Sequence, residues 1–243
     1  MKSGGKLQIL PWDSDWLGVL VARLVVTGAE AAIAVPAAVT QCRATGIRLL
    51  YLPVSPADAA ASAAARAVGA ELVDIRLTYR LPLTGGAVPP DLLPPGIALV
   101  PATALTAPLE ELAWLSGEYS RFRRDARIGE LAFRALYSRW LRRALAEGVV
   151  WVAATANEQT AGLLAFEALD HGPASIALLA VASTARRRHI GQCLVQMARQ
   201  EAQQRGCAEL RVVTQGANQP ARQLYEQCGF GLLRTEHYYH LWL

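Results

Sequence analysis

Three consecutive arginines, Arg186 to Arg188, stand where a predicted buried strand passes through a turn into a predicted helix. A helix N-terminus exposes several backbone N–H groups that lack an intrahelical partner, and it carries a partial positive charge. With guanidinium groups around it, such a turn is a cradle for an anion, and a pyrophosphate is the expected guest. Gly191 follows the turn, and its lack of a side chain would let the backbone approach a phosphate closely. The same residues also fit an ordinary basic turn.

Other common sites for phosphates and metals are not predicted. The chain contains neither a Walker pattern, G-x-x-x-x-G-K-[ST], nor the dinucleotide pattern G-x-G-x-x-G. Its four cysteines form no C-x-x-C pair and its four histidines are scattered, so no metal site is expected.

The composition predicts a folded cytoplasmic protein with reduced thiols. Hydrophobic residues make up 53% of the 243 residues and charged residues 18%, which excludes a disordered protein. No apolar stretch approaches the roughly 20 residues of a membrane helix, and no signal peptide is visible. A pI of about 9.0 and two arginine clusters raise the alternative of a nucleic-acid-binding module. That alternative is disfavoured because neither interleaved aromatic residues nor a helix-turn-helix pattern accompanies the arginines.

The elements that must position the arginine turn follow an α/β order with a mixed sheet. Hydrophobic periodicity and glycine stops predict helices over 29–43, 57–68, 109–116, 130–147, 190–204 and 219–227. Strands are predicted over 18–26, 49–52, 71–81, 149–156, 161–169, 176–181, 209–213 and 232–242. A proline-rich stretch over 82–108 cannot hold a long helix, so we place a domain boundary near residue 95. The predicted domains are residues 1–95 and 96–243.

A weak internal repeat relates the two domains at an offset of about 160 residues. Gly46 corresponds to Gly206, and Gly69 corresponds to Gly229, with helix, glycine and strand in the same order around them. The repeat is far too long for a solenoid. It indicates that the first domain is a degenerate half of the second, although chance matches of glycine and leucine are an alternative.

A second motif lies C-terminal to the arginine turn. Asn218, Ala221, Leu224-Tyr225 and Gly229-Phe230 fit the pattern N-x-x-A-x-x-L-Y-x-x-x-G-F. Together with the turn, this resembles the GNAT N-acetyltransferase superfamily, whose pyrophosphate loop usually reads R-G-x-G-I-G. Here the loop spans residues 186–191, and His189 stands where a structural glycine usually lies. If that position needs a positive φ, the histidine costs stability.

Three further segments resemble one branch of this superfamily, the branch that contains the TDP-fucosamine acetyltransferase. They are Pro11–Gly18, Ser120–Asp125 and Leu136–Leu141. The resemblance therefore covers almost the whole chain. It implies a C-terminal GNAT fold with splayed central strands, preceded by a smaller, degenerate GNAT-like domain.

The resemblance also implies acetyl-CoA as co-substrate, no metal, and direct attack by an acceptor amine in a ternary complex. Backbone groups of Leu179, Ala180 and Val181 would hold the pantetheine, and an N–H of Leu179 or Ala180 would stabilise the oxyanion. Tyr225 is the candidate general acid for the leaving thiolate, with a core aromatic residue as the alternative. The remaining candidate cofactor-binding residues are Arg186, Arg187, Arg188, His189, Ile190, Gly191 and Asn218, the last with a helix N-cap as its alternative.

The acceptor implied by the branch is the amino group of a nucleotide-linked deoxysugar. Arg121 and Arg123, in an arginine-rich turn, would bind its phosphates, and Tyr137 would shape the pocket. The alternatives are a solvated basic face and a core tyrosine. No general base is evident. Other acceptors, such as an antibiotic, an amino acid or a protein N-terminus, stay open, as does a non-catalytic acyl-CoA sensor. An exposed C-terminal edge strand would permit a homodimer.

Overall fold

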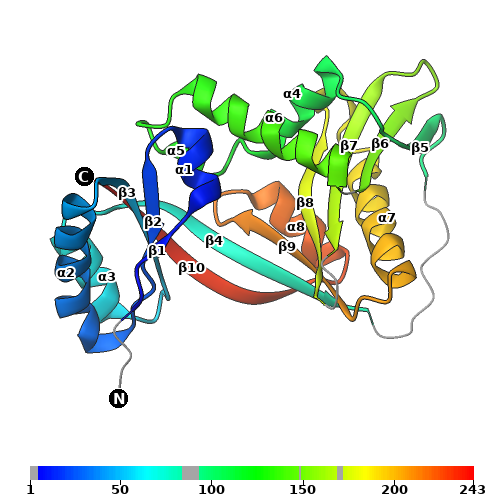
Figure 1. The fold of residues 1–243 in the computed structure, drawn as a ribbon. Helices are drawn as coiled ribbons and strands as arrows, with labels where there is room; N and C mark the ends of the chain where they lie inside the picture. The colour runs from blue at the N-terminus through cyan, green and yellow to red at the C-terminus, as the bar shows by residue number, and fades with distance from the viewer. Residues whose placement is uncertain (1–4, 84–92, 148, 169–171) are drawn as a thin grey trace. The chain divides into compact units, whose positions relative to one another are not determined.

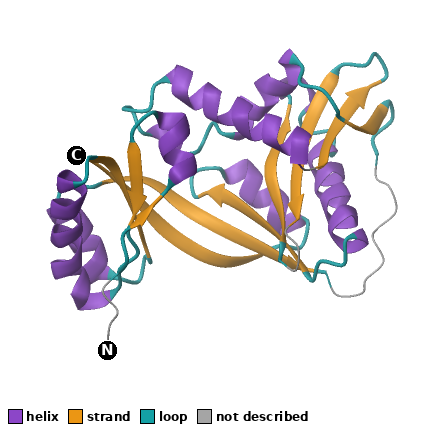
Figure 2. Ribbon diagram, in the orientation of Figure 1, coloured by secondary structure: helices purple, strands orange, loops and turns teal. Residues whose placement is uncertain are grey.

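The computed structural model describes residues 5–83, 93–147, 149–168 and 172–243 (Figure 1). Helices alternate with strands through most of the chain, so the predicted α/β class is confirmed (Figure 2). The chain forms two compact units. Unit 1 contains Met1–Leu77, Arg124–Ile128 and Arg234–Leu243, and unit 2 contains Thr78–Arg123 and Gly129–Leu233. The contiguous division into residues 1–95 and 96–243 stays a prediction.

Unit 1 is a mixed sheet with two long helices. Its elements are β1 (Gln8–Ile9), α1 (Pro11–Leu17), β2 (Leu20–Arg23), a 3₁₀ turn η1 (Gly28–Glu30), α2 (Ala31–Ala44), β3 (Ile47–Val54), α3 (Ala59–Ala67), the start of β4 (Glu71–Pro82) and most of β10 (Gly231–Trp242). The strand order is β1-β2-β3-β10-β4, with β2 and β3 parallel. Val35 of α2 and Leu50 and Leu52 of β3 belong to the buried core.

Unit 2 holds the larger part of the chain. Its elements are β5 (Ile97–Pro101), α4 (Ala107–Ser116), α5 (Arg121–Arg124), α6 (Glu130–Glu147), β6 (Val149–Thr155), β7 (Thr160–Ala168), β8 (Ala174–Val181), a 3₁₀ turn η2 (Ser183–Ala185), α7 (Ile190–Gln204), β9 (Glu209–Gln215) and α8 (Gln219–Gln227). The strands follow the order β4-β9-β8-β7-β6-β5. The predicted helices and strands of this region are confirmed within a few residues.

Helices cover both faces of the sheet in unit 2. Consecutive residues of β7 from Ala161 to Phe166 are all buried, and successive strand residues point to opposite faces. A Cβ added at Gly162 would lie 3.0 Å from Leu194 and 3.2 Å from Ile190, so α7 covers the face of Gly162. Helices α4 and α6 also pack against β7, and they account for the burial of the other face. The sheet therefore supports α7 through contacts with β7 and β8.

The internal repeat is present in the fold. β2-α2-β3-α3-β4 and β8-α7-β9-α8-β10 follow the same order, and the first two strands are parallel in each. Asp58 accepts a hydrogen bond from the N–H of Ala61 at the start of α3, as Asn218 does from Ala221 at the start of α8. Gly69 and Gly229, which follow these helices, have φ angles of 82° and 87°. Such a conformation strongly favours glycine, which explains the matched glycines.

The last strand of each repeat contributes to both units. β4 runs through unit 1 as far as Leu77 and enters unit 2 at Thr78. β10 belongs to unit 2 as far as Leu233 and to unit 1 from Arg234, where it pairs antiparallel with β3. These two strands are therefore divided between the units, which the sequence pattern did not predict.

Candidate active site

The pairing between strands β8 and β9 covers only the first three residues of β8. Their parallel register runs from Ala174 opposite Leu210 to Ile176 opposite Val212 and ends there. β8 continues to Val181, and it stays paired with β7 along that length, with Gly162 opposite Val181. The stretch that contains Leu179, Ala180 and Val181 therefore lies beyond the β8–β9 ladder. An exposed strand edge of this kind can pair with an extended ligand.

The arginine turn lies directly after this stretch. Arg186, Arg187, Arg188 and His189 are all exposed, and α7 begins at the buried Ile190. The Nε of Arg186 donates to the carbonyl of Val181 over 3.4 Å, which holds that side chain against the strand end. The free N–H groups of the first turn of α7 and the three guanidinium groups together make a positive site.

Two residues of this turn have a left-handed backbone. Arg187 has a φ of 63° and His189 a φ of 59°. Both lie where the GNAT loop pattern has glycine, yet the sequence analysis singled out only His189. A left-handed conformation costs a non-glycine residue roughly 1–2 kcal/mol. The histidine therefore does cost stability, and a hydrogen bond between its Nδ1 and Oε1 of Gln192, at 2.7 Å, steadies the side chain.

Gly191 has a packing role that the sequence analysis did not foresee. A Cβ at this position would lie 3.2 Å from Cδ2 of Leu224 and 3.8 Å from Cγ2 of Val181. The absence of a side chain lets α7 approach α8 closely. This contact joins the arginine turn to the Asn218–Phe230 motif, so the structure brings the two motifs together.

Asn218 immediately precedes helix α8, and Tyr225 lies within it. Asn218 accepts from the N–H of Ala221 over 3.2 Å, so its helix-capping role is present. Tyr225 is only 4% exposed, and its ring lies near the rings of Phe230 and Tyr79, with centroids 5.7 and 6.2 Å away. Burial, and to a lesser extent Cys228, raises the pKa of Tyr225. The phenol is therefore neutral at physiological pH and can donate a hydrogen bond.

The predicted acceptor residues lie on α5 and α6. Arg121 lies over the ring of Phe122 at 4.1 Å, and Arg123 forms an ion pair with Glu130 and lies 5.3 Å from the ring of Phe133. Glu130 neutralises part of the charge that a phosphate would meet at Arg123.

Tyr137 is a core residue. It is 4% exposed, and its ring packs so closely on Gly117 that an added Cβ there would overlap it. The rings of Phe133 and Trp140 lie 4.9 and 5.1 Å from it. Its role toward an acceptor stays a prediction.

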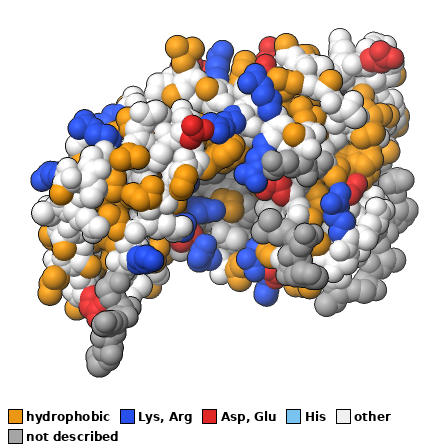
Figure 3. Space-filling model, viewed as in Figure 1, with side chains coloured by type: hydrophobic (Ala, Val, Ile, Leu, Met, Phe, Trp, Pro, Cys, Tyr) orange, Lys and Arg blue, Asp and Glu red, His pale blue; other side chains and the backbone are white. Residues whose placement is uncertain are grey.

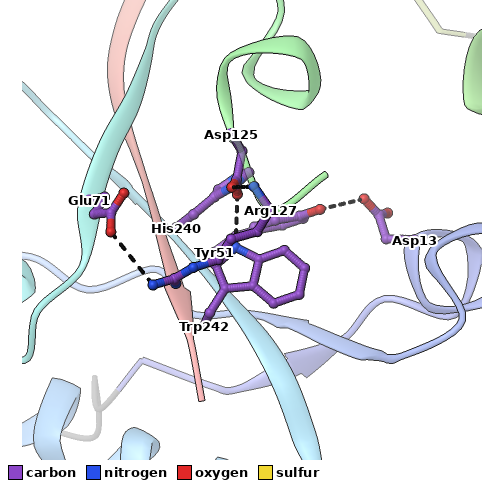
Figure 4. A network of polar contacts seen from close by, with 7 residues as sticks. All are labelled: Asp13, Tyr51, Glu71, Asp125, Arg127, His240 and Trp242. Atoms are coloured by element: carbon purple, nitrogen blue, oxygen red, sulfur yellow. Dashed lines mark hydrogen bonds and ion pairs between the residues drawn. The ribbon is translucent and has the colours of Figure 1, made fainter. Parts of the chain in front are cut away.

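A second polar cluster, which the sequence analysis missed, lies inside unit 1 (Figure 4). Oδ2 of Asp125 accepts hydrogen bonds from Nδ1 of His240 at 2.6 Å and from Nε1 of Trp242 at 2.9 Å. Oδ1 accepts from the backbone N–H of Arg127, and the ring of Tyr51 stacks on His240 at 4.6 Å. The two-residue spacing of His240 and Trp242 was a signal, since it puts both on one face of a strand.

The pKa of Asp125 reflects two opposing effects. Burial raises the pKa. A larger opposing effect comes from the hydrogen bonds donated by His240, Trp242 and the backbone of Arg127, together with the charge of His240. The pKa is therefore below its usual range. This cluster ties the segment Arg124–Ile128 to β10 within unit 1.

The described residues contain no group of three or more His, Cys, Asp or Glu side chains that could hold a metal ion. In that part of the chain, no helix is both long and apolar enough to cross a membrane. On the face drawn in Figure 3, arginine and lysine side chains lie in separate groups among hydrophobic and acidic ones.

Comparisons with known proteins agree on the fold. Residues 109–230, about half of the chain, match the model of the Acetyltransferase (GNAT) family. A GCN5-related N-acetyltransferase from Sphaerobacter thermophilus has 14% identity and a TM-score of 0.68, covering 98% of this chain and 76% of that one. A tandem GNAT protein of the clavulanic acid biosynthesis pathway has 18% identity and a TM-score of 0.60, covering 91% of this chain and 75% of that one.

A third solved structure is a glucosamine N-acetyltransferase region of a fungal multi-domain β-N-acetylglucosaminidase. It has 14% identity and a TM-score of 0.59, covering 98% of this chain and 31% of that one. No curated protein sequence matches the chain. At these identities the structural likeness concerns the fold alone.

Proposed function

The chain belongs to the GNAT acetyltransferase family, and from this premise we propose that it transfers acetyl from acetyl-CoA to the amino group of a nucleotide-linked amino-deoxysugar. The observation that carries the donor half of the proposal is the end of the β8–β9 ladder at Ile176, directly before the arginine turn and α7. An extended pantetheine fits beside the freed strand, and its diphosphate fits the positive helix start. Acetyl-CoA is the acyl donor that the family implies.

The proposed reaction needs no side-chain nucleophile. The amine nitrogen attacks the thioester carbonyl carbon, and an N–H of Leu179 or Ala180 stabilises the oxyanion. The C–S bond then breaks, which leaves an amide and the thiolate of CoA. Tyr225 donates to the sulfur as it leaves, and the proton lost from the nitrogen passes to water.

The raised pKa of Tyr225 defines how it would act. A free thiol has a pKa of about 8.5, so a phenol with a pKa above its usual value of about 10 is the weaker acid. Tyr225 therefore stays protonated at working pH and supports the leaving group through a short hydrogen bond that strengthens as charge develops. A complete proton transfer needs the phenol to be reprotonated by water.

The acceptor half of the proposal rests on the branch resemblance and on the arginines of α5. The resemblance of Pro11–Gly18, Ser120–Asp125 and Leu136–Leu141 to the TDP-fucosamine acetyltransferase branch supports a sugar bearing a nucleoside diphosphate. Arg121 supplies a guanidinium group at the motif, and Arg123 a second one that shares its charge with Glu130.

A panel of acceptors tests the proposal. Thermal shift is measured with acetyl-CoA and separately with TDP- and UDP-amino sugars, simple amino sugars, an aminoglycoside, amino acids and a peptide N-terminus. Turnover is followed as release of free CoA. We expect a shift with acetyl-CoA and turnover with a nucleotide-amino sugar. A shift with acetyl-CoA but turnover only with another amine would keep the acetyltransferase and replace its acceptor.

A further inference from the structure

Helix α8 is lightly anchored for an element that carries a proposed acid. Tyr225 is the one buried residue among its nine. At its start, Asn218 caps the helix, and Nη1 of Arg222 donates to the carbonyl of Gly216 at 3.2 Å. Specific contacts near Tyr225 therefore bear directly on the rotation of this helix about its axis.

One such contact comes from β4. The hydroxyl of Tyr79, a residue that is 2% exposed, donates to Oε1 of Glu226 over 2.8 Å. Glu226 follows Tyr225 directly in α8. Arg222, one turn earlier on the same helix, also interacts with the Tyr79 hydroxyl. The hydroxyl of Tyr79 therefore meets the same helix at two points, one turn apart.

The rings add a second restraint. The ring of Tyr79 lies 6.2 Å from that of Tyr225 at an interplanar angle of 46°, and Phe230 lies on Tyr225 at 5.7 Å and 54°. Aromatic pairs at such distances and angles are mutually favourable and limit the tilt of the ring between them. Tyr79 thus contacts helix α8 in two ways: its hydroxyl bonds the side chain of Glu226, and its ring lies beside the ring of Tyr225.

We propose that Tyr79 is a positioning residue for catalysis: its hydrogen bond to Glu226 and its ring contact fix the rotation of α8, so that the Tyr225 hydroxyl reaches the thioester sulfur. This rests on the role proposed for Tyr225. A displaced donor weakens the hydrogen bond to a developing thiolate steeply, because such bonds depend on distance and angle. Strand β4, the last strand of the first repeat, therefore provides the residue that positions Tyr225, the proposed acid of the second repeat.

The repeat offers a matched control. Tyr239 of β10 corresponds to Tyr79, and in unit 1 its hydroxyl accepts a hydrogen bond from Nη1 of Arg66 on α3 at 3.3 Å. Ala65 stands on α3 where Tyr225 stands on α8. Tyr239→Phe thus removes the equivalent hydroxyl, which contacts a helix that carries no proposed acid.

The test compares Tyr79→Phe, Glu226→Ala, Tyr225→Phe and Tyr239→Phe with the wild-type chain. Release of free CoA is measured with dTDP-4-amino-4,6-dideoxygalactose as acceptor, and separately with water as acceptor, which needs no knowledge of the amine. Acetyl-CoA affinity is measured by calorimetry. We expect Tyr79→Phe and Glu226→Ala each to lower kcat about tenfold, the equivalent of about 1.4 kcal/mol, and to leave the acetyl-CoA affinity within about twofold. Tyr239→Phe should leave kcat within about twofold.

Double variants separate positioning from a general loss of structure. Tyr79→Phe together with Glu226→Ala should cost no more than either change alone, since both remove the same bond. Tyr79→Phe should have no further effect on kcat when Tyr225 is already Phe. If it lowers kcat equally in both backgrounds, Tyr79 does not act through Tyr225 and the inference is overturned.

Two outcomes bear on different claims. If Tyr225→Phe leaves kcat unchanged with both acceptors, the role of Tyr225 in the proposed function fails, and this inference fails with it. If Tyr225→Phe lowers kcat while Tyr79→Phe and Glu226→Ala do not, only the positioning role fails. Should Tyr79→Phe fold poorly, the exposed Glu226 provides the same comparison, with Glu226→Gln expected to restore most of the kcat lost in Glu226→Ala because it keeps an acceptor oxygen.

Discussion

The two repeats share the same order of helices and strands but differ in the loop before the first helix and in the residue that caps the second helix. In the first repeat, the N–H of Gly28 donates to Oδ2 of Asp58 at 2.6 Å, and the other oxygen of that carboxylate caps α3. In the second repeat, the counterpart of Asp58 is the neutral Asn218, which caps α8. The loop before α7 contains three arginines. In the first repeat, the carboxylate of Asp58 therefore accepts the hydrogen bond from the loop N–H of Gly28. In the second repeat, Asn218 stands at the same position and carries no negative charge.

The difference extends to the chemistry of the second helix. Tyr225 has Ala65 as its counterpart, so the first repeat lacks the phenol proposed to act on a leaving thiolate. Unit 1 instead encloses the polar cluster around Asp125 and His240. One scaffold thus supports a structural role in one copy and a proposed catalytic site in the other, and a few side chains account for the difference.

The largest expected effect tests the polar cluster of unit 1. Asp125→Ala would leave His240 buried without its carboxylate, and breaking a buried pair in this way costs about 3–5 kcal/mol. Urea unfolding should show that loss. The control Arg127→Ala keeps the backbone N–H that bonds Asp125 and removes only an exposed pair with Glu71, so it should cost less than about 1 kcal/mol. Equal effects would mean that the cluster is not what holds this segment.

The next effect tests the proposed acid of the second repeat. Tyr225→Phe keeps the buried ring and removes the hydroxyl, so kcat should fall on the order of 100-fold while acetyl-CoA affinity is largely kept. Steady-state kinetics and calorimetry measure the two quantities separately. Cys228→Ser, which changes a neighbouring side chain on the same turn, serves as a control for local disturbance. A 100-fold loss of affinity without a change in kcat would assign Tyr225 to binding.

A reciprocal pair of changes tests the backbone difference between the two loops. His189→Gly should raise the free energy of unfolding by about 1 kcal/mol, because it removes a side chain from a left-handed position. Gly28→Ala should lower it by a similar amount, since Gly28 has a φ of 63° in the first repeat. Glu158→Gly, at a φ of 60° in the β6–β7 turn, is a control expected to stabilise the fold as well. Destabilisation by His189→Gly would show that its bond to Gln192 outweighs the backbone cost.

The smallest effect concerns pH. Hydrogen bonds from the N–H groups of Ala61 and Gly28 lower the pKa of Asp58. Its contribution to stability is therefore fully present above the unfolded pKa of about 3.9 and is lost as the pH falls through the lower folded value. Asp58→Asn should lower the thermal midpoint at pH 7, and the difference from wild type should narrow at about pH 3. A difference that is the same at both pH values would mean that the charge of Asp58 is not involved.

Much of the fold followed from short-range rules in the sequence. Apolar periodicity located α6 and α7, and glycines with a positive φ marked the ends of α3 and α8. The helix α1 was not predicted, although Pro11 at its first position and Gly18 after its end are ordinary boundary signals. The strand β5 lies within the proline-rich stretch and owes its place to pairing with β6. Its partner, a long-range feature, could not be seen locally.

The candidate site divides in the same way. The residue types and spacings of the arginine turn and of Asn218–Phe230 were sufficient to predict a GNAT loop and helix, because loop and cap chemistry is local. The sequence did not reveal that Gly191 packs on Leu224, that Arg187 is left-handed, or that Asp125 meets His240 across more than a hundred residues. Those depend on which elements pack together.

The sequence by itself determined most of the helices and strands and the repeat, and it supplied the residues that are proposed to hold a diphosphate. Only the tertiary structure decided that β4 and β10 each contribute to both units, and that Tyr79 lies beside Tyr225. The physical reason is range. Propensity, capping and backbone φ act over a few residues, whereas strand partners and buried contacts depend on segments far apart in the chain, selected by the burial of apolar surface and the pairing of polar groups.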